Sequence, residues 1–252
     1  MNFLDYKISG LKKRIRCTQY GIFYFRNSDF KIPKVLLING IKRELQFKNL
    51  SIDEFTDICI NDCYRLGYLR KKLRNVSSIV DIGANQGMFL CAARQYFPHA
   101  HITGYEPNRE LEDTLSFNAD QLNSKVYYEA IMKHECMVDL HFTESDLATQ
   151  AHESAKGTAA GTSFERMIER AGCIDILKLD CEGTEWELLE KTDLWKNIKS
   201  LSLEYHLWGR SGITIKYLFQ LLDDLNFQLI YHSILNSDQG IVLAINKQNL
   251  KV

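Results

Sequence analysis

The sequence of 252 residues lacks the features of several protein classes. Its formal net charge is only -1, so no overall excess of positive charge favours nucleic acid or an anionic membrane. No run is apolar enough to span a bilayer, and Asp5, Lys7 and Ser9 interrupt the segment where a signal peptide needs a hydrophobic stretch. We therefore expect a chain with no integral membrane segment and no nucleic acid partner.

Cysteine pairing is also missing. The seven cysteines form no C-x-x-C pair and show no Cys/His spacing that resembles a zinc site. An odd number of scattered cysteines indicates reduced, small apolar side chains rather than disulfides. Together with the missing signal peptide, this pattern predicts a reducing, cytoplasmic location.

Two local clusters of positive charge, at residues 12–14 and 70–74, depart from the balanced total. We interpret them as solvated surfaces. An anionic substrate or a membrane surface is the alternative partner for them.

The most informative stretch is S-I-V-D-I-G-A-N-Q-G at residues 78–87. Its short β-branched run predicts a buried parallel strand with Asp81 near the carboxyl end. Gly83 and Gly87 permit a sharp turn, after which residues 88–93 predict a buried helix.

The turn lacks the glycines of the common nucleotide motifs. A dinucleotide fingerprint would need glycine at Asn85 and Met88, and a P-loop would need Lys-Ser or Lys-Thr after Gly87. The turn instead contains an acid, two glycines and a side-chain amide. These groups suit a ligand that carries an amino acid group. Asp81 can bind its ammonium and the loop N–H groups its carboxylate. The alternative is an ordinary strand-to-helix turn of another α/β protein.

The rest of the chain alternates between predicted strands and helices. Strands are expected at residues 102–105, 125–131, 137–142, 174–179 and 201–206, helices at 111–122, 163–171, 186–189 and 213–225, and a terminal hairpin at 227–235 and 241–246. Residues 143–162 have no periodicity, so they predict a surface loop.

We predict that residues 1–75 form an amino-terminal extension and that residues 76–252 form the main domain. The expected elements of the extension are a strand-like run at 20–25, a hairpin at 34–38 and 41–47 with Asn39-Gly40 as its turn, and a helix at 51–73. Ser51 and Glu54 have the spacing of a capping box. Tyr64 and Tyr68 are expected in the core, with a place in a cofactor lid as the alternative.

Ionisable side chains stand where several predicted strands end. Glu106 follows the second strand, where an acid can accept both hydroxyls of a ribose. Ala130 lies near the end of the third strand, at the expected place of an adenine. Asp180 ends the fourth strand, and Glu204 and His206 share one face of the fifth.

These motifs resemble the FkbM family of methyltransferases. They are D-I-G-A-N-Q-G at residues 81–87, E-P-N at 106–108, K-L-D-C-E-G at 178–183 and E-Y-H at 204–206. The resemblance covers approximately residues 45–247. It implies a Rossmann-like class I methyltransferase fold of the α/β class, with a mostly parallel seven-stranded sheet and an antiparallel C-terminal hairpin. It also implies S-adenosylmethionine as cofactor and the hydroxyl of a sugar, glycan or natural product as acceptor.

The resemblance also implies roles for single residues. The cofactor would be held by Asp81, Gly83, Asn85, Gly87, Glu106 and Asn108, and the methyl group and acceptor would be surrounded by Asp180, Glu182, Glu204 and His206. No proline follows the fourth strand, so the Asn/Asp-Pro-Pro-aromatic loop used for methylating amino groups is absent. Oxygen is therefore the expected acceptor.

Methyl transfer to a hydroxyl needs alignment and removal of a proton. The candidate bases are His206, Asp180 and Glu204, with His206 ranked first because its pKa suits neutral pH. Asp180 alternatively contacts the amino group of the cofactor. We expect Lys178 to form a buried ion pair with Asp81 or Glu204.

Three alternatives stay open at this stage. The same acidic and imidazole side chains can hold a divalent metal ion, although no metal is assigned. An NAD-dependent oxidoreductase and a non-catalytic cofactor-binding protein are the competing classes. The identity of the acceptor and the oligomeric state do not follow from the sequence.

Overall fold

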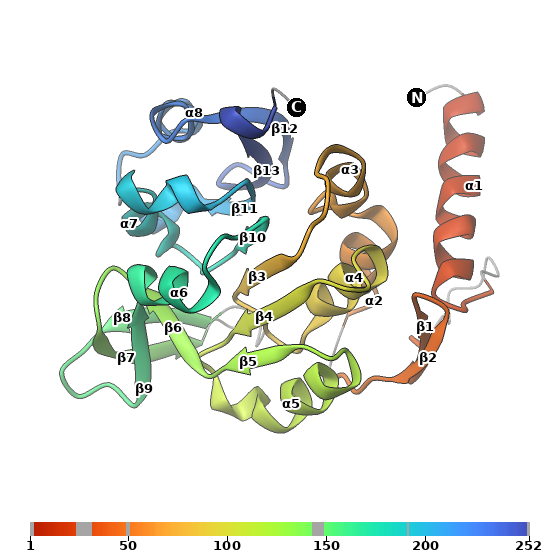
Figure 1. Cartoon of the computed structure of the whole chain (residues 1–252), viewed down its shortest axis with the longest axis horizontal. Coiled ribbons are helices and arrows are strands. Elements are labelled where there is room, and N and C mark those ends of the chain that lie inside the picture. Colours follow the sequence, from red (N-terminus) through yellow and green to blue (C-terminus); the bar gives the residue numbers. More distant parts are fainter. Residues whose placement is uncertain (1–2, 24–31, 49–50, 143–148, 191, 251–252) are drawn as a thin grey trace.

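The centre of the molecule is a seven-stranded sheet with strand order β12-β13-β11-β10-β3-β4-β5. The structure, a computed structural model, describes residues 3–23, 32–48, 51–142, 149–190 and 192–250 (Figure 1). The strands of this sheet are β3 (Ser78–Ile82), β4 (His101–Tyr105), β5 (Lys125–Tyr127), β10 (Ile176–Leu179), β11 (Ser200–His206), β12 (Phe227–Ile234) and β13 (Gln239–Asn246). The strand β13 runs antiparallel to the other six, which are parallel to one another. The predicted mostly parallel sheet with an antiparallel C-terminal hairpin is confirmed.

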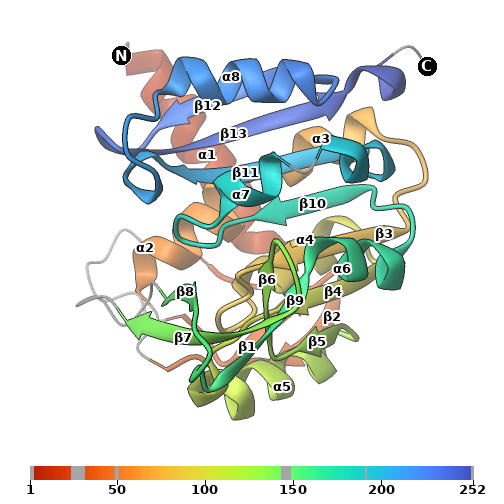
Figure 2. The same cartoon turned by 90° about the vertical axis from the view of Figure 1, so that its left-hand side faces the viewer.

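Helices cover both faces of this sheet because successive strand side chains point to opposite sides. Ile79 and Ile102 pack against the first helix layer, and Val80 and Leu177 against the second. The first layer contains α4 (Met88–Tyr96) and α5 (Glu112–Gln121), and the second contains α6 (Phe164–Ala171), α7 (Glu185–Leu189) and α8 (Ile215–Asp224) (Figure 2). Short 3-10 turns lie at Arg109–Leu111, Thr192–Asn197, Leu207–Gly209 and Lys247–Asn249.

A second, four-stranded sheet corrects two predictions. It contains β6 (Glu129–Met132), β7 (Cys136–Phe142), β8 (Thr149–Glu153) and β9 (Ala159–Ser163), in the order β6-β9-β7-β8. The strand predicted at 125–131 is therefore wrong as a single element, because its two halves, β5 and β6, belong to different sheets. The loop predicted at 143–162 is also wrong where the structure describes it, since it contains β8 and β9.

The strand β9 forms through its neighbours rather than through its own sequence. It is built from Ala159-Ala160-Gly161 and lies between β6 and β7. A Cβ at Gly161 would come within 2.9 Å of the sulfur of Cys136 and of Met132 Cγ. Small residues thus allow close pairing, and strand propensity alone does not reveal it.

The amino-terminal segment begins with a helix that the sequence did not predict, α1 (Phe3–Gln19). The strand expected at 20–25 is wrong over residues 20–23, where the chain turns after α1, and its remainder lies outside the described residues. The predicted hairpin is confirmed as β1 (Val35–Ile38) and β2 (Ile41–Glu44). Asn39 and Gly40 both have positive φ, 50° and 78°, as a type I′ turn requires.

The helix predicted at 51–73 is interrupted. Its pieces are α2 (Ile52–Phe55), a π-helical turn (Thr56–Asn61) and α3 (Leu66–Lys72). Ser51 caps α2 as expected, accepting the N–H of Glu54 at 3.0 Å. The break occurs because Asp62, at φ 58°, accepts the N–H groups of Leu66 at 2.7 Å and Gly67 at 3.0 Å and so starts a new helix.

The amino-terminal segment packs into the main core, since Phe55 and Leu66 belong to the same buried cluster as Leu90 of α4. In the described part of the chain, no helix has the length and apolar character needed to cross a bilayer. The division at residues 75 and 76 stays a prediction.

Candidate active site

A cavity of about 530 Å³ opens where β3, β4, β10 and β11 end. Carboxyl ends of parallel strands meet at one edge of a sheet, so residues distant in sequence converge there. The cavity wall includes Tyr64, Gly83, Asn85, Glu106, Ala130, Asp180, Glu182 and Glu204. Its volume is in the range of sites for ligands of cofactor size.

Gly83 lets two strand exits approach each other. It has φ 79°, and a Cβ at this position would lie 1.9 Å from the backbone oxygen of Asp180. The glycine is therefore needed for contact between the ends of β3 and β10. Gly87, with φ 88°, precedes α4 and completes the turn.

A buried ion pair lies beneath this turn. Lys178 Nζ is 3.2 Å from Asp81 Oδ1 and 3.3 Å from Asp180 Oδ2, and Asp81 and Lys178 are 0% and 3% exposed. Burial raises the pKa of Asp81 to about 6, although Lys178 opposes the shift. Burial lowers the pKa of Lys178, but Asp81 and Asp180 outweigh it and raise the pKa above its usual value. The predicted ion pair with Asp81 is confirmed.

Glu106 joins the loops after β3 and β4. Its two carboxylate oxygens accept the N–H groups of Asn85 at 2.8 Å and Asn108 at 2.9 Å. Burial raises the pKa of Glu106 to about 6, while these hydrogen bonds lower it. The Asn108 side chain accepts the N–H of Glu110 and caps the following turn. Glu106 is thus fixed at the cavity wall.

Tyr64 connects two acids that line the cavity, Asp180 and Glu204. Its hydroxyl donates to Glu204 Oε2 at 3.0 Å and contacts Asp180 Oδ2 at 3.3 Å. The hydroxyl of Ser202, on β11, donates to the carbonyl oxygen of Tyr64 at 3.0 Å. The ring of Tyr64 packs edge-on against Phe89. The sequence placed Tyr64 in the core or a cofactor lid, and it lines the cavity.

His206 lies behind the cavity wall. It is 1% exposed and is not among the lining residues. Its Nδ1 is 3.1 Å from Glu185 Oε1, and its Nε2 is 3.4 Å from Glu182 Oε2. Burial disfavours the charged ring, but the hydrogen bond and charge of Glu185, with Asp180 and Glu182, raise the pKa of His206 to about 9. The imidazole is therefore mostly protonated near neutral pH.

Two carboxyl groups at this end have pKa values close to neutrality. Burial, followed by the charge of Asp180, raises the pKa of Glu204 to about 8, and His206, Tyr64 and Lys178 oppose it. Burial and Asp180 likewise raise the pKa of Glu182 to about 7. Such groups can exchange protons near neutral pH.

The residues singled out from the sequence fall into two groups. Those that line the cavity are Gly83, Asn85, Glu106, Ala130, Asp180, Glu182 and Glu204. Asp81, Gly87, Asn108 and His206 are not lining residues and contact or support those that are. Glu185 was missed, because its place at the start of α7 gave no sign that its carboxylate would also accept the His206 backbone N–H at 2.8 Å.

Two groups in the described residues have ligand atoms close enough for one metal ion. Atoms of Asp180, Glu204 and His206 lie within 4.8 Å of one another, so the metal alternative at the cavity stays open. His134, Cys136 and Glu153 meet the same limit on the second sheet. Sequence spacing did not suggest the second group, because pairing of β7 with β8 creates it.

Three solved structures are similar to this chain, and the first of them supports the fold. The METTL16 methyltransferase domain has a TM-score of 0.51 at 10% identity, covering 96% of this chain and 81% of that chain. TrmK of M. capricolum in complex with S-adenosyl-homocysteine has a TM-score of 0.43 at 14% identity, covering 73% and 67%. The putative methyltransferase yhhF from Escherichia coli has a TM-score of 0.44 at 14% identity, covering 82% and 92%. No curated protein matches in a sequence comparison.

The sequence profile of the FkbM methyltransferase domain matches residues 81–229. That range contains the turn after β3, Glu106, and the ends of β10 and β11, and covers more than half of the chain. This chain therefore belongs to the FkbM family of methyltransferases, which use S-adenosylmethionine as cofactor.

Proposed function

We propose that this methyltransferase acts on oxygen, transferring the methyl group to a hydroxyl of a sugar, glycan or natural product. One observation carries the proposal: the Glu204 carboxylate lines the cavity, and its pKa is raised to about 8. A hydroxyl acceptor must lose its proton when it takes up the methyl group, so its methylation needs a base. Binding of the cofactor by itself needs none. A carboxylate poised near the working pH suits that step.

The cavity fits S-adenosylmethionine in its chemistry. Glu106 is nearly fully buried at the end of β4, where an acid can accept ribose hydroxyls, and Ala130 offers an apolar wall for the adenine. We propose that Gly83, Asn85 and Asp180 lie along the amino acid portion. Asp81, Gly87 and Asn108 hold these loops in place.

When bound, S-adenosylmethionine supplies an electrophilic methyl group at its sulfonium. Glu204 accepts the hydroxyl proton of the acceptor, and the Tyr64 hydroxyl holds the Glu204 carboxylate towards Asp180. His206, fixed by Glu185, keeps a positive charge behind Glu182. The sequence ranked His206 first as base, but its burial and raised pKa favour Glu204 in that role.

A labelling experiment tests the proposal. The purified protein is incubated with methyl-labelled S-adenosylmethionine and a host extract, and the labelled product is identified by mass spectrometry and NMR. A methyl ether supports the proposal. A label on nitrogen, carbon or sulfur contradicts it, and no label from any extract favours a non-catalytic cofactor-binding protein.

Glu106→Ala is expected to weaken binding of S-adenosylhomocysteine by about tenfold to hundredfold. Losing a hydrogen-bonding carboxylate costs ~1.5–3 kcal/mol, which corresponds to that change in Kd. Calorimetry measures the Kd, and titration with NAD in parallel separates the oxidoreductase alternative. Glu110→Ala, an exposed acid on the next turn, is the matched control. Equal affinity of wild type and Glu106→Ala would remove Glu106 from the cofactor site.

Activity is expected to rise with pH through about 8. Glu204 must be ionised to accept a proton, and its pKa of about 8 leaves it mostly protonated below that value. The kcat/KM should therefore increase roughly tenfold per pH unit below 8 and level off above it. A profile already flat from pH 6 to 9 would be inconsistent with Glu204 as the base.

A metal-assisted version of the same transfer rests on the proximity of Asp180, Glu204 and His206. A divalent ion there would acidify the acceptor hydroxyl directly. Activity that is lost in EDTA and restored by Mg²⁺ or Mn²⁺ supports it. Activity that is unchanged in EDTA excludes it.

A further inference from the structure

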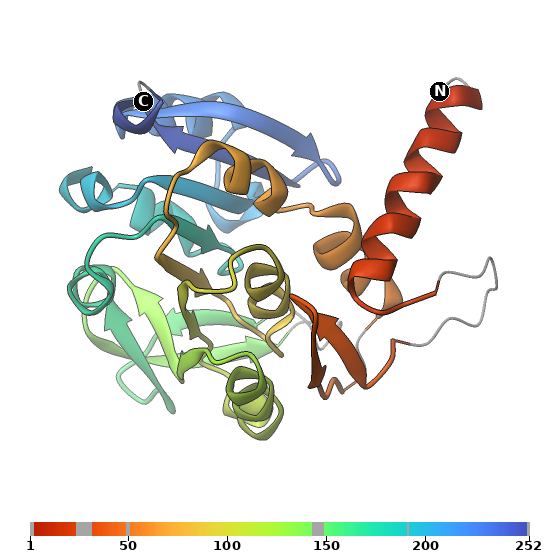
Figure 3. The same ribbon diagram turned by 45° about the vertical axis from the view of Figure 1, so that its right-hand side comes forward.

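The described side chains of α1, those of residues 11–19, anchor the helix near its carboxyl end. Near its carboxyl end, Arg16 donates to the carbonyl oxygen of Ile60 at 2.6 Å and lies 3.7 Å from Asp62. Cys17 and Tyr20 are buried in the core. From there the helix projects away from the sheet, and its amino-terminal end stands clear of the other elements in two views (Figures 1 and 3).

Two large apolar side chains of α1 are exposed. Leu11 and Ile15 stand one turn apart on one side of the helix and are 60% and 51% exposed. Lys13, Arg16 and Cys17, on other sides, are half-buried or buried. In a surface helix the apolar stripe normally packs towards the core. Leu11 and Ile15 instead face away from the core.

Exposed cations flank this stripe. Lys12 and Arg14 lie beside Leu11 and Ile15 and are both exposed. The helix as a whole has five basic residues and one acid, in the sequence FLDYKISGLKKRIRCTQ. We call Leu11, Lys12, Arg14 and Ile15 the outward face of α1.

A second basic segment stands near the anchored end. The last turn of α3 contains Arg70, Lys71 and Lys72, all exposed. Asp62, which lies 3.7 Å from Arg16 of α1, also accepts the N–H groups of Leu66 and Gly67 in the first turn of α3. The carboxyl end of α1 and the start of α3 therefore meet at Asp62.

We propose that the outward face of α1 docks on the surface of a membrane rich in anionic phospholipid. A helix with an apolar stripe flanked by lysine and arginine is suited to lie in the headgroup region, with leucine and isoleucine towards the acyl chains. A second copy of α1 would bring like charges together. Nucleic acid would use the cations but gives no reason for exposed Leu11 and Ile15. Docking of this face does not depend on the identity of the methyl acceptor.

Flotation with vesicles tests the proposal. The full chain is mixed with vesicles of phosphatidylcholine alone or with added phosphatidylglycerol, and the bound fraction is measured at low and high salt. We expect binding that requires phosphatidylglycerol and falls strongly between about 0.1 M and about 1 M salt, where screening becomes short-ranged. Absence of binding to phosphatidylglycerol vesicles at low salt would overturn the proposal.

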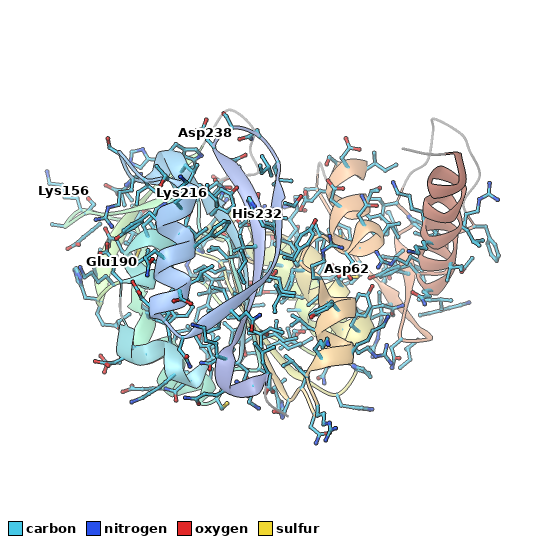
Figure 4. The ribbon with its side chains drawn as sticks, turned by 90° about the horizontal axis from the view of Figure 1, so that it is seen from above. Asp62, Lys156, Glu190, Lys216, His232 and Asp238 are labelled. Atoms are coloured by element: carbon cyan, nitrogen blue, oxygen red, sulfur yellow. The ribbon has the colours of Figure 1, made fainter. Side chains whose placement is uncertain are left out.

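Paired variants separate the apolar and electrostatic contributions. L11S/I15S and K12E/R14E should each lower the partition coefficient at least about tenfold. The matched control is K156E/K216E, which makes the same change of charge at exposed lysines on the far side of the molecule from α1 (Figure 4). Unchanged circular dichroism and cofactor binding show that each variant is folded.

Other outcomes identify a different partner. Equal binding of L11S/I15S and wild type to vesicles would mean that the apolar stripe is not inserted, which contradicts the proposal. Tighter binding to RNA than to vesicles, lost in K12E/R14E and kept in L11S/I15S, would point to nucleic acid. Sedimentation showing a dimer that L11S/I15S dissociates would assign the face to a second copy.

Discussion

Replacing Glu204 by glutamine is expected to lower kcat by about 10²–10⁴-fold, the usual contribution of a general base. Glutamine keeps the shape of the side chain and can still contact the Tyr64 hydroxyl, but it cannot accept a proton. The measurement is steady-state turnover on the acceptor identified by labelling. The rise in activity through pH 8 should disappear in the same variant.

Glu190→Gln is the matched control for this variant, because its carboxylate is exposed and paired with Arg210 outside the cavity. Its kcat should equal that of the wild type. Binding of S-adenosylhomocysteine to Glu204→Gln should change little, so a lost kcat is not a lost cofactor. A Glu204→Gln enzyme with wild-type kcat would move the role of base to Asp180 or His206.

Lys178→Met is expected to destabilise the fold by about 3–5 kcal/mol, because it leaves the fully buried Asp81 without its cation. Lys178 also donates to the carbonyl oxygens of Ile82 at 3.2 Å and Gly83 at 2.6 Å, so these acceptors lose a partner too. For a chain of this size the loss corresponds to a fall in Tm of roughly 6–20 °C. Calorimetry or thermal circular dichroism measures it.

Lys247→Met provides the comparison for Lys178→Met. Lys247 forms an ion pair with Asp223 at 2.6 Å, but both side chains are exposed. Surface pairs contribute only ~0–1 kcal/mol, so Tm should hardly change. Similar Tm values for the two variants would show that the Asp81 carboxyl is neutral or finds another partner in the folded protein.

Much of the sheet followed from local patterns in the sequence. Buried parallel strands appear as short apolar runs, and each predicted strand exit delivers a polar residue, such as Glu106 or Asp180, to the same edge. The buried pair of Lys178 and Asp81 also followed, since a lysine inside an apolar strand needs an acid. These features depend on neighbours in the chain or on strand order alone.

The other parts of the fold and of the site depend on contacts between segments distant in sequence, which local sequence patterns do not predict. The strand β9 exists because Gly161 lets it pair closely with β6 and β7. Glu185 reaches His206 only because α7 packs across the end of β11. The helix α1 was missed, and two of its apolar residues, Leu11 and Ile15, are exposed rather than part of a buried side.

The position of Tyr64 has a consequence for engineering this enzyme. Tyr64 comes from the segment ahead of the region matched by the family profile, and that segment also supplies Glu54, Asp57, Ile58, Asn61 and Arg65 to the cavity. This part of the cavity wall is thus encoded separately from the loops that we assign to the cofactor. Chimaeras that exchange residues 51–73 between family members should transfer acceptor preference while keeping affinity for S-adenosylmethionine, which makes this stretch the natural unit for recombination.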